Sequence, residues 1–202
     1  MKDSPTKRKV VEAASSLFYQ KGFHGTSVRD IAEKASVNVS SISYYFKGKQ
    51  GLLEYAVSRY YEEYLAIIEA TLEESSDDTP NEKLKKLIHK IIQYKHSNLQ
   101  LSCFIHRELS MDSVFVREMV VTYLAKENFI IGNAFTAVVK GGNVDKQKLD
   151  RQFLLMQLKG MLVTPYVLHN EWRSQVVGDY SHSLFVTKYV QTIHQWIDYI
   201  TQ

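Results

Sequence analysis

The stretch from Thr26 to Lys49 constrains the fold more than any other part of the chain. Its first half places apolar residues at the i, i+3, i+4 and i+7 spacing of one helix face, namely Val28, Ile31, Ala32 and Ala35. The pattern breaks at 36–38, and a second short helix is predicted at 39–46. One face of that helix carries hydroxyls that can approach base edges and phosphates, on Ser40, Ser41, Ser43 and Tyr44. The stretch therefore predicts a helix-turn-helix whose second helix enters a DNA groove.

The ends of these helices carry the residue types that close helices. We expect the hydroxyl of Thr26 to cap the first helix and the side chain of Asn38 to cap the second. A third apolar stripe lies upstream and ends at the typical helix stop Lys21-Gly22; it consists of Val10, Ala13, Ala14, Leu17 and Phe18. Three short helices can share one small core, so residues 1–48 are predicted to form a DNA-binding domain.

Residues 7–53 resemble the DNA-binding domain of the TetR family of bacterial regulators. The matching features are AxxLFxxKGFxxTSVRDIA at 14–32, Ala-Ser-Val at 35–37, Ile-Ser-Tyr-Tyr-Phe at 42–46, then Lys49 and Leu52-Leu53. The chain departs from the family at Ser43, where an aromatic residue is usual, and at 38–41, where many members read Ser-x-Gly-Thr. These positions face DNA in the family, so the operator sequence cannot be copied from a relative.

The resemblance implies an all-α, TetR-like fold. A three-helix helix-turn-helix domain at 1–48 would be followed by a helical regulatory and dimerisation domain of about six helices at 49–202. The remaining sequence agrees, because prolines occur only at 5, 80 and 165 and strand-like alternation is scarce. The acidic, turn-rich segment 73–80 is predicted to be a break between helices and is the best linker candidate.

A dimer would place two recognition helices in successive major grooves of a palindromic double-stranded site, about 34–36 Å apart. We expect Val39 to touch a thymine methyl group, Arg29 to reach a guanine edge, and four side chains to meet bases or nearby phosphates, namely Ser40, Ser41, Ser43 and Tyr44. The resemblance implies phosphate contacts from Thr26, Tyr45 and Lys49. Because the Tyr45 ring falls on the apolar helix face, a core position is its alternative role.

The charge distribution agrees with a DNA-binding end. Residues 1–50 hold nine lysines or arginines against four acidic residues, whereas 51–202 hold sixteen against eighteen. A positive surface is the electrostatic footprint that phosphates require, although the run Lys7-Arg8-Lys9 also fits a solvated tail. The single cysteine, Cys103, lies in an apolar run and suits a buried thiol in a reducing compartment. The first residues do not resemble a signal peptide and no apolar run is long enough for a membrane span, so we expect a cytoplasmic, nucleoid-associated protein.

Two apolar helices are predicted at the C-terminal end, at 145–170 and 182–200. In the TetR family the corresponding pair forms a four-helix bundle with a second subunit. The resemblance therefore implies a homodimer interface that contains Phe153, Leu154, Leu158, Met161, Leu162, Phe185, Tyr189, Ile193 and Trp196. The alternative is that both helices complete the core of one subunit.

The role of the second domain is open between two hypotheses. One is a small-molecule pocket lined from Tyr94, Phe104, Met119, Tyr123, Met156 and Tyr166, although such residues at helical spacing also suit a plain core. The other is a protein-contact surface around the charged pairs Arg107-Glu108 and Arg117-Glu118, whose ordinary role is a solvated face.

Two segments, 37–64 and 101–118, also resemble a TetR-family regulator of the bacterial cell-division ring. That resemblance implies a sporulating Gram-positive source and FtsZ as a partner, with Arg107 and Arg117 helping either to engage FtsZ or to position the DNA-binding domains. The alternative function is a ligand-responsive repressor of a nearby operon. Whether a small-molecule effector exists is left open at this point.

Enzymatic function is not expected. The seven histidines, at 24, 89, 96, 106, 169, 182 and 194, show no HExxH or other paired metal-ligand spacing. The chain contains neither a glycine-rich phosphate loop nor a nucleophile elbow. We therefore predict no catalytic residues, no metal and no cofactor.

Overall fold

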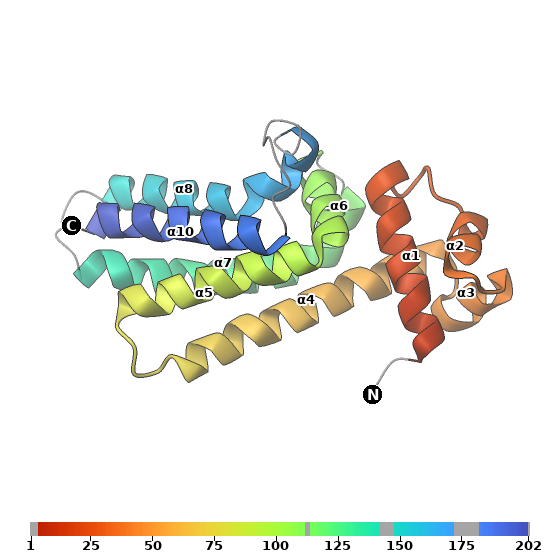
Figure 1. Ribbon diagram of the computed structural model, residues 1–202, viewed down its shortest axis with the longest axis horizontal. Coiled ribbons are helices and arrows are strands. Elements are labelled where there is room, and N and C mark those ends of the chain that lie inside the picture. The colour runs from red at the N-terminus through yellow and green to blue at the C-terminus, as the bar shows by residue number, and fades with distance from the viewer. Residues whose placement is uncertain (1–3, 112–113, 142–147, 172–181, 202) are drawn as a thin grey trace. The chain divides into compact units, whose positions relative to one another are not determined.

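The computed structural model describes residues 4–111, 114–141, 148–171 and 182–201, and every regular element given bounds within them is an α-helix (Figure 1). The elements are α1 (Pro5–Lys21), α2 (Val28–Ala35), α3 (Val39–Phe46), α4 (Lys49–Glu74), α5 (Pro80–Ser97), α6 (Leu99–Ser110), α7 (Val114–Gly141), α8 (Lys148–Val167) and α10 (His182–Thr201). The all-α prediction is confirmed. None of the described helices is both long and apolar enough to cross a membrane.

The chain divides into two compact units. Unit 1 comprises residues 1–62 and 98–120, and unit 2 comprises residues 63–97 and 121–202. The division therefore falls inside α4 and inside α7, and α6 belongs with the first three helices. The domain boundary predicted at 48/49 does not coincide with either division point, and it stays a prediction.

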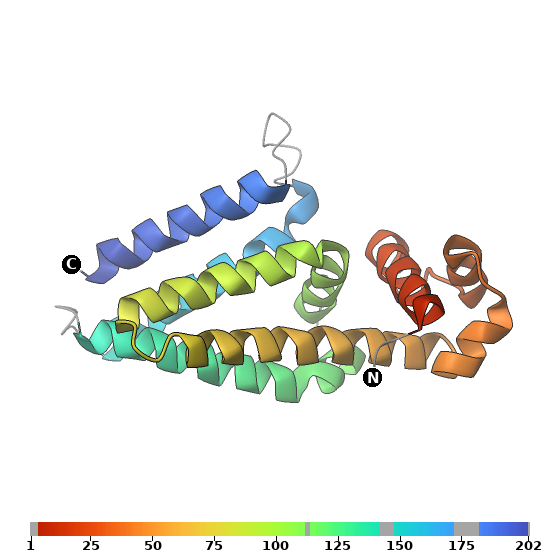
Figure 2. The same cartoon turned by 60° about the horizontal axis from the view of Figure 1, so that its bottom comes forward.

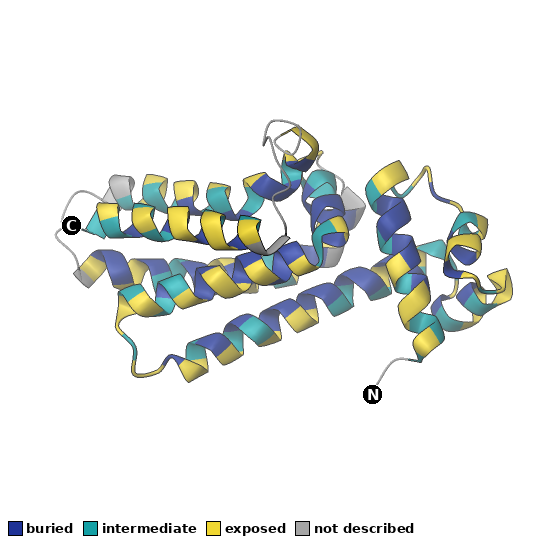
Figure 3. Ribbon diagram, viewed as in Figure 1, coloured by how far each residue is buried: buried dark blue, intermediate teal, exposed yellow. Residues whose placement is uncertain are grey.

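The core of unit 1 forms where α1 packs against α2 and α6. The predicted α1 stripe is buried in full and consists of Val10, Ala13, Ala14, Leu17 and Phe18 (Figure 3). The centroid of the Phe18 ring lies 5.5 Å from that of Phe104 on α6, and neither side chain is exposed. Burying a ring of this size contributes about 1.5–3 kcal/mol. The first helix of the DNA-binding domain is thus held from both sides.

The turn after α1 is shaped by two glycines. Gly22 has a φ of 71°, and its N–H donates to the carbonyl of Phe18 at 2.9 Å, which confirms the predicted helix stop. At Gly25 a Cβ atom would lie 2.3 Å from the carbonyl oxygen of Lys21. A side chain at position 25 would therefore push the turn apart.

The predicted cap of α2 at Thr26 is wrong, because Ser27 is the capping residue. The Ser27 hydroxyl accepts the N–H of Asp30 at 3.1 Å, and the Asp30 carboxylate accepts the N–H of Ser27 at 2.9 Å. These hydrogen bonds, led by the one from the Ser27 backbone, lower the pKa of the Asp30 carboxyl group. The Thr26 hydroxyl instead donates to the carbonyl of Gly22 at 2.8 Å, and the side chain is buried.

Unit 2 is built around α5, which packs against α10 and α8 (Figure 2). The buried face of α5 includes Leu84, Leu87, Ile88, Ile91 and Ile92. The Tyr189 hydroxyl on α10 donates to the carbonyl of Met161 on α8 at 2.7 Å, and that of Tyr166 donates to the carbonyl of Ile92 at 3.3 Å. The predicted helix break near 73–80 is confirmed, since α4 ends at Glu74 and α5 begins at Pro80, but it is a turn inside unit 2.

A charged cluster lies inside unit 2. The carboxylate of Glu127 on α7 accepts the hydroxyl of Tyr64 on α4 at 2.5 Å and the ammonium group of Lys95 on α5 at 3.2 Å. All three residues are buried. Removing one partner of a buried ion pair is strongly destabilising, because it leaves an uncompensated charge in a medium of low dielectric constant.

We predict that Glu127→Ala lowers the free energy of unfolding by about 3–5 kcal/mol, because the Lys95 ammonium group then loses its buried counter-charge. The double variant Lys95→Met, Glu127→Leu should lose much less free energy of unfolding, since both charges are removed together. Urea unfolding of both variants measures the difference. A cost below about 1 kcal/mol for Glu127→Ala would contradict the role given to the cluster.

Candidate nucleic-acid interface

Helix α3 exposes a polar face and buries the opposite, apolar face. Ile42 and Phe46 are buried and anchor the helix to unit 1. Four other side chains are exposed, namely Val39, Ser40, Ser43 and Tyr44, and Tyr44 is the most exposed of them at 82%. Ser41 is half-buried. The small hydroxyls allow close approach to a groove, and Tyr44 adds a long hydrogen-bonding side chain at its rim.

Both ends of α3 are fixed by its own sequence. The side chain of Asn38 accepts the N–H of Ser40 at 2.9 Å, so the predicted N-cap is confirmed. The Ser40 hydroxyl also donates to Asn38 Oδ1 at 2.8 Å. Before this cap, Ser36 takes a left-handed conformation with a φ of 54°, and the N–H of Val37 donates to the carbonyl of Ala32. The turn between α2 and α3 is therefore set by backbone hydrogen bonds.

Lys49 holds the turn between α1 and α2 onto the start of α4. Its ammonium group donates to the carbonyl of Phe23 at 2.8 Å and to the carbonyl of Thr26 at 2.7 Å. It also lies 4.4 Å from the centroid of the Phe23 ring, within the range of a cation–π interaction. Two of its three N–H donors are thus engaged within unit 1. The phosphate contacts expected of Lys49 and of buried Thr26 stay predictions.

The two remaining predicted contact residues differ in their surroundings. Arg29 is exposed on α2. The Tyr45 ring is half-buried, lies edge-on to Tyr44 at 5.0 Å between centroids, and has the Lys7 ammonium group 5.7 Å from its centroid. Tyr45 is therefore neither a full core residue nor a free surface residue, and its phosphate contact stays a prediction.

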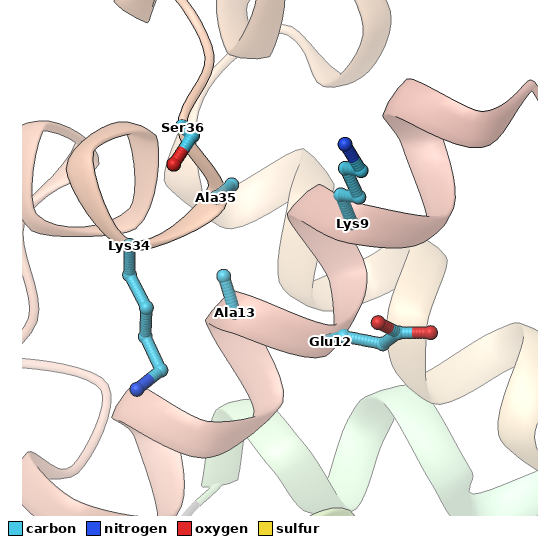
Figure 4. Close-up of a pocket in the computed structure, with 6 residues that line it drawn as sticks. All are labelled: Lys9, Glu12, Ala13, Lys34, Ala35 and Ser36. Carbon is cyan, nitrogen blue, oxygen red and sulfur yellow. The ribbon is translucent and has the colours of Figure 1, made fainter.

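A hollow of about 400 Å³ lies between α1 and the end of α2 (Figure 4). Ala13 and Ala35 face each other in it, while the amino groups of Lys9 and Lys34 point in different directions. Glu12 contributes a carboxylate to the same rim. Two diverging ammonium groups suit separate points on a phosphate backbone better than a single small anion.

Arg107, which is predicted to lie on a partner surface, contacts α1, and the partner contact itself stays a prediction. From α6, its guanidinium group donates to the carbonyls of Phe18 and Tyr19 at 3.2 and 3.0 Å, and lies 6.0 Å from the centroid of the Tyr19 ring. The last carbonyls of a helix lack intrahelical partners, and a cation is favoured there. The sequence predicts that the carbonyls at the end of α1 need a hydrogen-bond donor, but it does not predict that Arg107 is that donor. Glu108 is half-buried, and Arg117 and Glu118 are exposed.

The predicted dimer residues separate into two groups. Leu158, Leu162 and Ile193 are at most 1% exposed within one subunit, as the monomer-core alternative expects. Phe153 is 51% exposed, and the others are half-buried, namely Leu154, Met161, Phe185, Tyr189 and Trp196. The Phe185 ring stacks on Tyr189 at 5.2 Å and on His96 at 4.6 Å between centroids. Dimerisation through the exposed and half-buried group stays a prediction.

The residues suggested for an effector pocket come from both units, and the pocket stays a prediction. Phe104 belongs to the core of unit 1, whereas Tyr94 and Tyr166 are buried in unit 2. Met156 is 61% exposed, and the side chain of Met119 lies outside the described residues.

Cys103 is buried, and the loss of solvent raises its pKa to about 12, so it is an unreactive thiol. No group of three potential metal ligands occurs in the described part of the chain.

Comparison with known proteins places this geometry in a family. The family model described as bacterial regulatory proteins, tetR family, matches residues 10–56. The chain is 40% identical over 195 residues to YttP, a probable HTH-type transcriptional regulator of Bacillus subtilis (strain 168), and the match covers 95% of this chain and 92% of YttP. The chain belongs to the TetR family. Regulators of this family bind DNA, act as dimers and are not enzymes.

Solved structures share the fold at lower identity. PfmR, a TetR-family transcriptional regulator from Thermus thermophilus, superposes with a TM-score of 0.72 at 17% identity, covering 95% of this chain and 96% of PfmR. FadR from Bacillus subtilis in complex with stearoyl-CoA superposes with a TM-score of 0.65 at 21% identity, covering 91% of this chain and 95% of FadR. These matches confirm the TetR-like fold over nearly the whole chain.

We predict that Tyr44→Ala weakens binding to the operator by about 1–3 kcal/mol and leaves the melting temperature unchanged, because the exposed ring supports no core contact. The operator is first selected from random DNA with the full chain, and affinity is then measured by fluorescence anisotropy. Tyr199→Ala removes a tyrosine that is 78% exposed on α10, and serves as the matched control. Equal losses in both variants, or no loss in Tyr44→Ala, would contradict the interface.

Lys49→Met tests whether the ammonium group supports the turn or binds phosphate. Two charge-assisted hydrogen bonds would be lost, so we expect the free energy of unfolding to fall by about 1.5–3 kcal/mol. The dependence of the logarithm of affinity on that of salt concentration should keep its slope. A slope smaller by about 0.9, with stability unchanged, would show instead that Lys49 neutralises a phosphate.

Proposed function

We propose that this chain is a transcriptional regulator that binds a palindromic operator as a dimer and leaves it when a small molecule binds its second domain. The observation that carries the DNA-binding half is the exposed polar face of α3, held outward by the buried side chains of Ile42 and Phe46. Two copies of α3, related by dimer symmetry, would read the two half-sites.

The effector half of the proposal is supported by relatives and by unit 2. The fatty acid metabolism regulator of Bacillus subtilis is 23% identical over 170 residues, and the FadR structure contains stearoyl-CoA. In this chain, Lys95 supplies a buried cation whose counter-charge is the Glu127 carboxylate, which also accepts the Tyr64 hydroxyl. An anionic headgroup that competes with Glu127 for this cation would bias unit 2 between two packings. An effector shifts the balance between two packings only if it binds one of them more tightly than the other.

Long-chain acyl-CoA thioesters are the first effector class to test. We expect stearoyl-CoA to raise the dissociation constant for the operator at least about fivefold, whereas coenzyme A alone should not. Anisotropy of labelled operator DNA measures release, and isothermal titration calorimetry measures thioester binding directly. Binding without release, or no binding by any acyl chain length, would contradict this effector class.

A second candidate function rests on the resemblance of segments 37–64 and 101–118 to RefZ, a DNA-bound regulator of the FtsZ division ring. In that role the protein would bind chromosomal sites, associate with the nucleoid, and inhibit ring assembly at septation or sporulation. Arg117 and Glu118 are exposed and would offer the contact surface, together with half-buried Glu108. Arg107 would contribute through the position of α1 rather than through direct contact.

Genome-wide mapping of bound sites by chromatin immunoprecipitation separates the two functions. We expect sites in one or a few promoters, and loss of every site in the Tyr44→Ala variant. Palindromic sites away from promoters, clustered near the replication origin, would contradict the promoter-bound regulator and favour the division role. In that case, Arg117→Ala should relieve division inhibition without changing site occupancy.

A further inference from the structure

An apolar groove of about 300 Å³ lies on unit 2, whereas the residues assigned to DNA belong to unit 1. Helices α4, α5 and α7 all contribute to the groove, and its lining includes Leu72, Pro80, Phe129, Ala134 and Ala137. Phe129 is 69% exposed, while its neighbour Ile130, which also lines the groove, is 9% exposed. A large exposed aromatic ring beside an almost wholly apolar hollow is a typical mark of a binding surface.

The groove is bordered by an acidic turn. Residues 69–82 hold six acidic side chains and no lysine or arginine. Half of these are used within unit 2: Glu69 pairs with Lys126 at 2.6 Å, Asp78 pairs with Lys86 at 2.6 Å, and Glu82 accepts the hydroxyl and N–H of Thr79. The other three are exposed, and no ion pair is found for them among the described residues, namely Glu73, Glu74 and Asp77.

The cation that lines the groove does not cancel this charge. Lys83 donates from its ammonium group to the carbonyl of Ser76 at 2.7 Å, and so is drawn to the turn. The apolar hollow thus adjoins a chain segment, residues 69–82, that supplies Leu72 and Pro80 to its lining and carries surplus negative charge. Nucleic acid and anionic lipid would be repelled there, because their phosphates carry the same sign.

We propose that this groove docks a basic amphipathic segment of another protein. An apolar side chain of the partner would enter the hollow beside Phe129, and lysine or arginine side chains next to it would meet Glu73, Glu74 and Asp77. Charge complementarity of this kind sets orientation and speeds association. The inference is independent of the function proposed above, because it uses neither α3 nor the buried cluster around Glu127.

The test uses a defined probe with the full chain. A fluorescein-labelled helical peptide with leucine at the i, i+3, i+4 and i+7 positions and lysine elsewhere is titrated at physiological salt, alongside the same peptide with glutamate in place of lysine. We expect the lysine peptide to bind at least about tenfold more tightly than the glutamate peptide, since only one has complementary charge.

Two variants of the groove and two matched controls locate the binding. Two variants should each weaken binding of the lysine peptide about tenfold. One is Phe129→Ser, and the other is the triple variant Glu73→Gln, Glu74→Gln, Asp77→Asn. Val121→Ser alters another exposed apolar residue of α7, and the triple variant Glu33→Gln, Glu54→Gln, Glu62→Gln makes the same charge change elsewhere. Both controls should leave the affinity for the lysine peptide unchanged. Retained operator binding shows that each variant is folded.

Three results would overturn the proposal. The first is equal binding of the two peptides, or no binding at all. The second is an equal loss in the control variants, which would indicate diffuse attraction to an acidic surface. The third is self-association of the full chain that Phe129→Ser abolishes, which would mean that a second copy covers the groove.

Discussion

The charge-assisted hydrogen bonds from Lys49 to the carbonyls of Phe23 and Thr26 are the interaction on which the DNA-binding surface depends. They tie the turn between α1 and α2 to the first residue of α4, in addition to the hydrogen bonds that the turn makes within itself. The capping box of α2 begins directly after this turn, and α3 follows it through a short, backbone-bonded corner. Loss of the Lys49 ammonium group is therefore expected to loosen the turn that precedes both helices of the helix-turn-helix.

Arg107 supports the same domain from the other side. Its guanidinium group donates to the carbonyls of Phe18 and Tyr19 in the last turn of α1, while Phe104 from the same helix as Arg107 packs on Phe18. Helix α6 thus moves with the DNA-binding helices as part of unit 1, although it lies far from them in sequence. A regulatory signal that displaced α6 would act directly on α1. Helix α6 is therefore a physical link in this chain between the regulatory and the DNA-binding functions of the family.

Local features were predictable from the sequence, and long-range ones were not. The bounds of α3 and its Asn38 cap follow from spacing and residue type, and both are confirmed. The α2 cap was assigned to the wrong hydroxyl because Thr26 and Ser27 both precede the stripe; the three-residue spacing from Ser27 to Asp30 identifies the correct one. The roles of Lys49 and Arg107 depend on carbonyls 23 or more residues away in sequence, which no periodicity encodes. For the same reason the burial of Leu158 and Ile193 within one subunit required the packed structure.

The central claim is that α3 reads DNA from the major groove as one half of a dimer. Dimethyl sulfate protection of the bound operator tests it most directly, because the reagent methylates guanine N7 in the major groove and adenine N3 in the minor groove. The account predicts two symmetric sets of protected guanines with centres about one helical turn or slightly more apart, about 34–36 Å at the closest spacing, and little change at adenine. A single protected set, or protection of adenines alone, would contradict it.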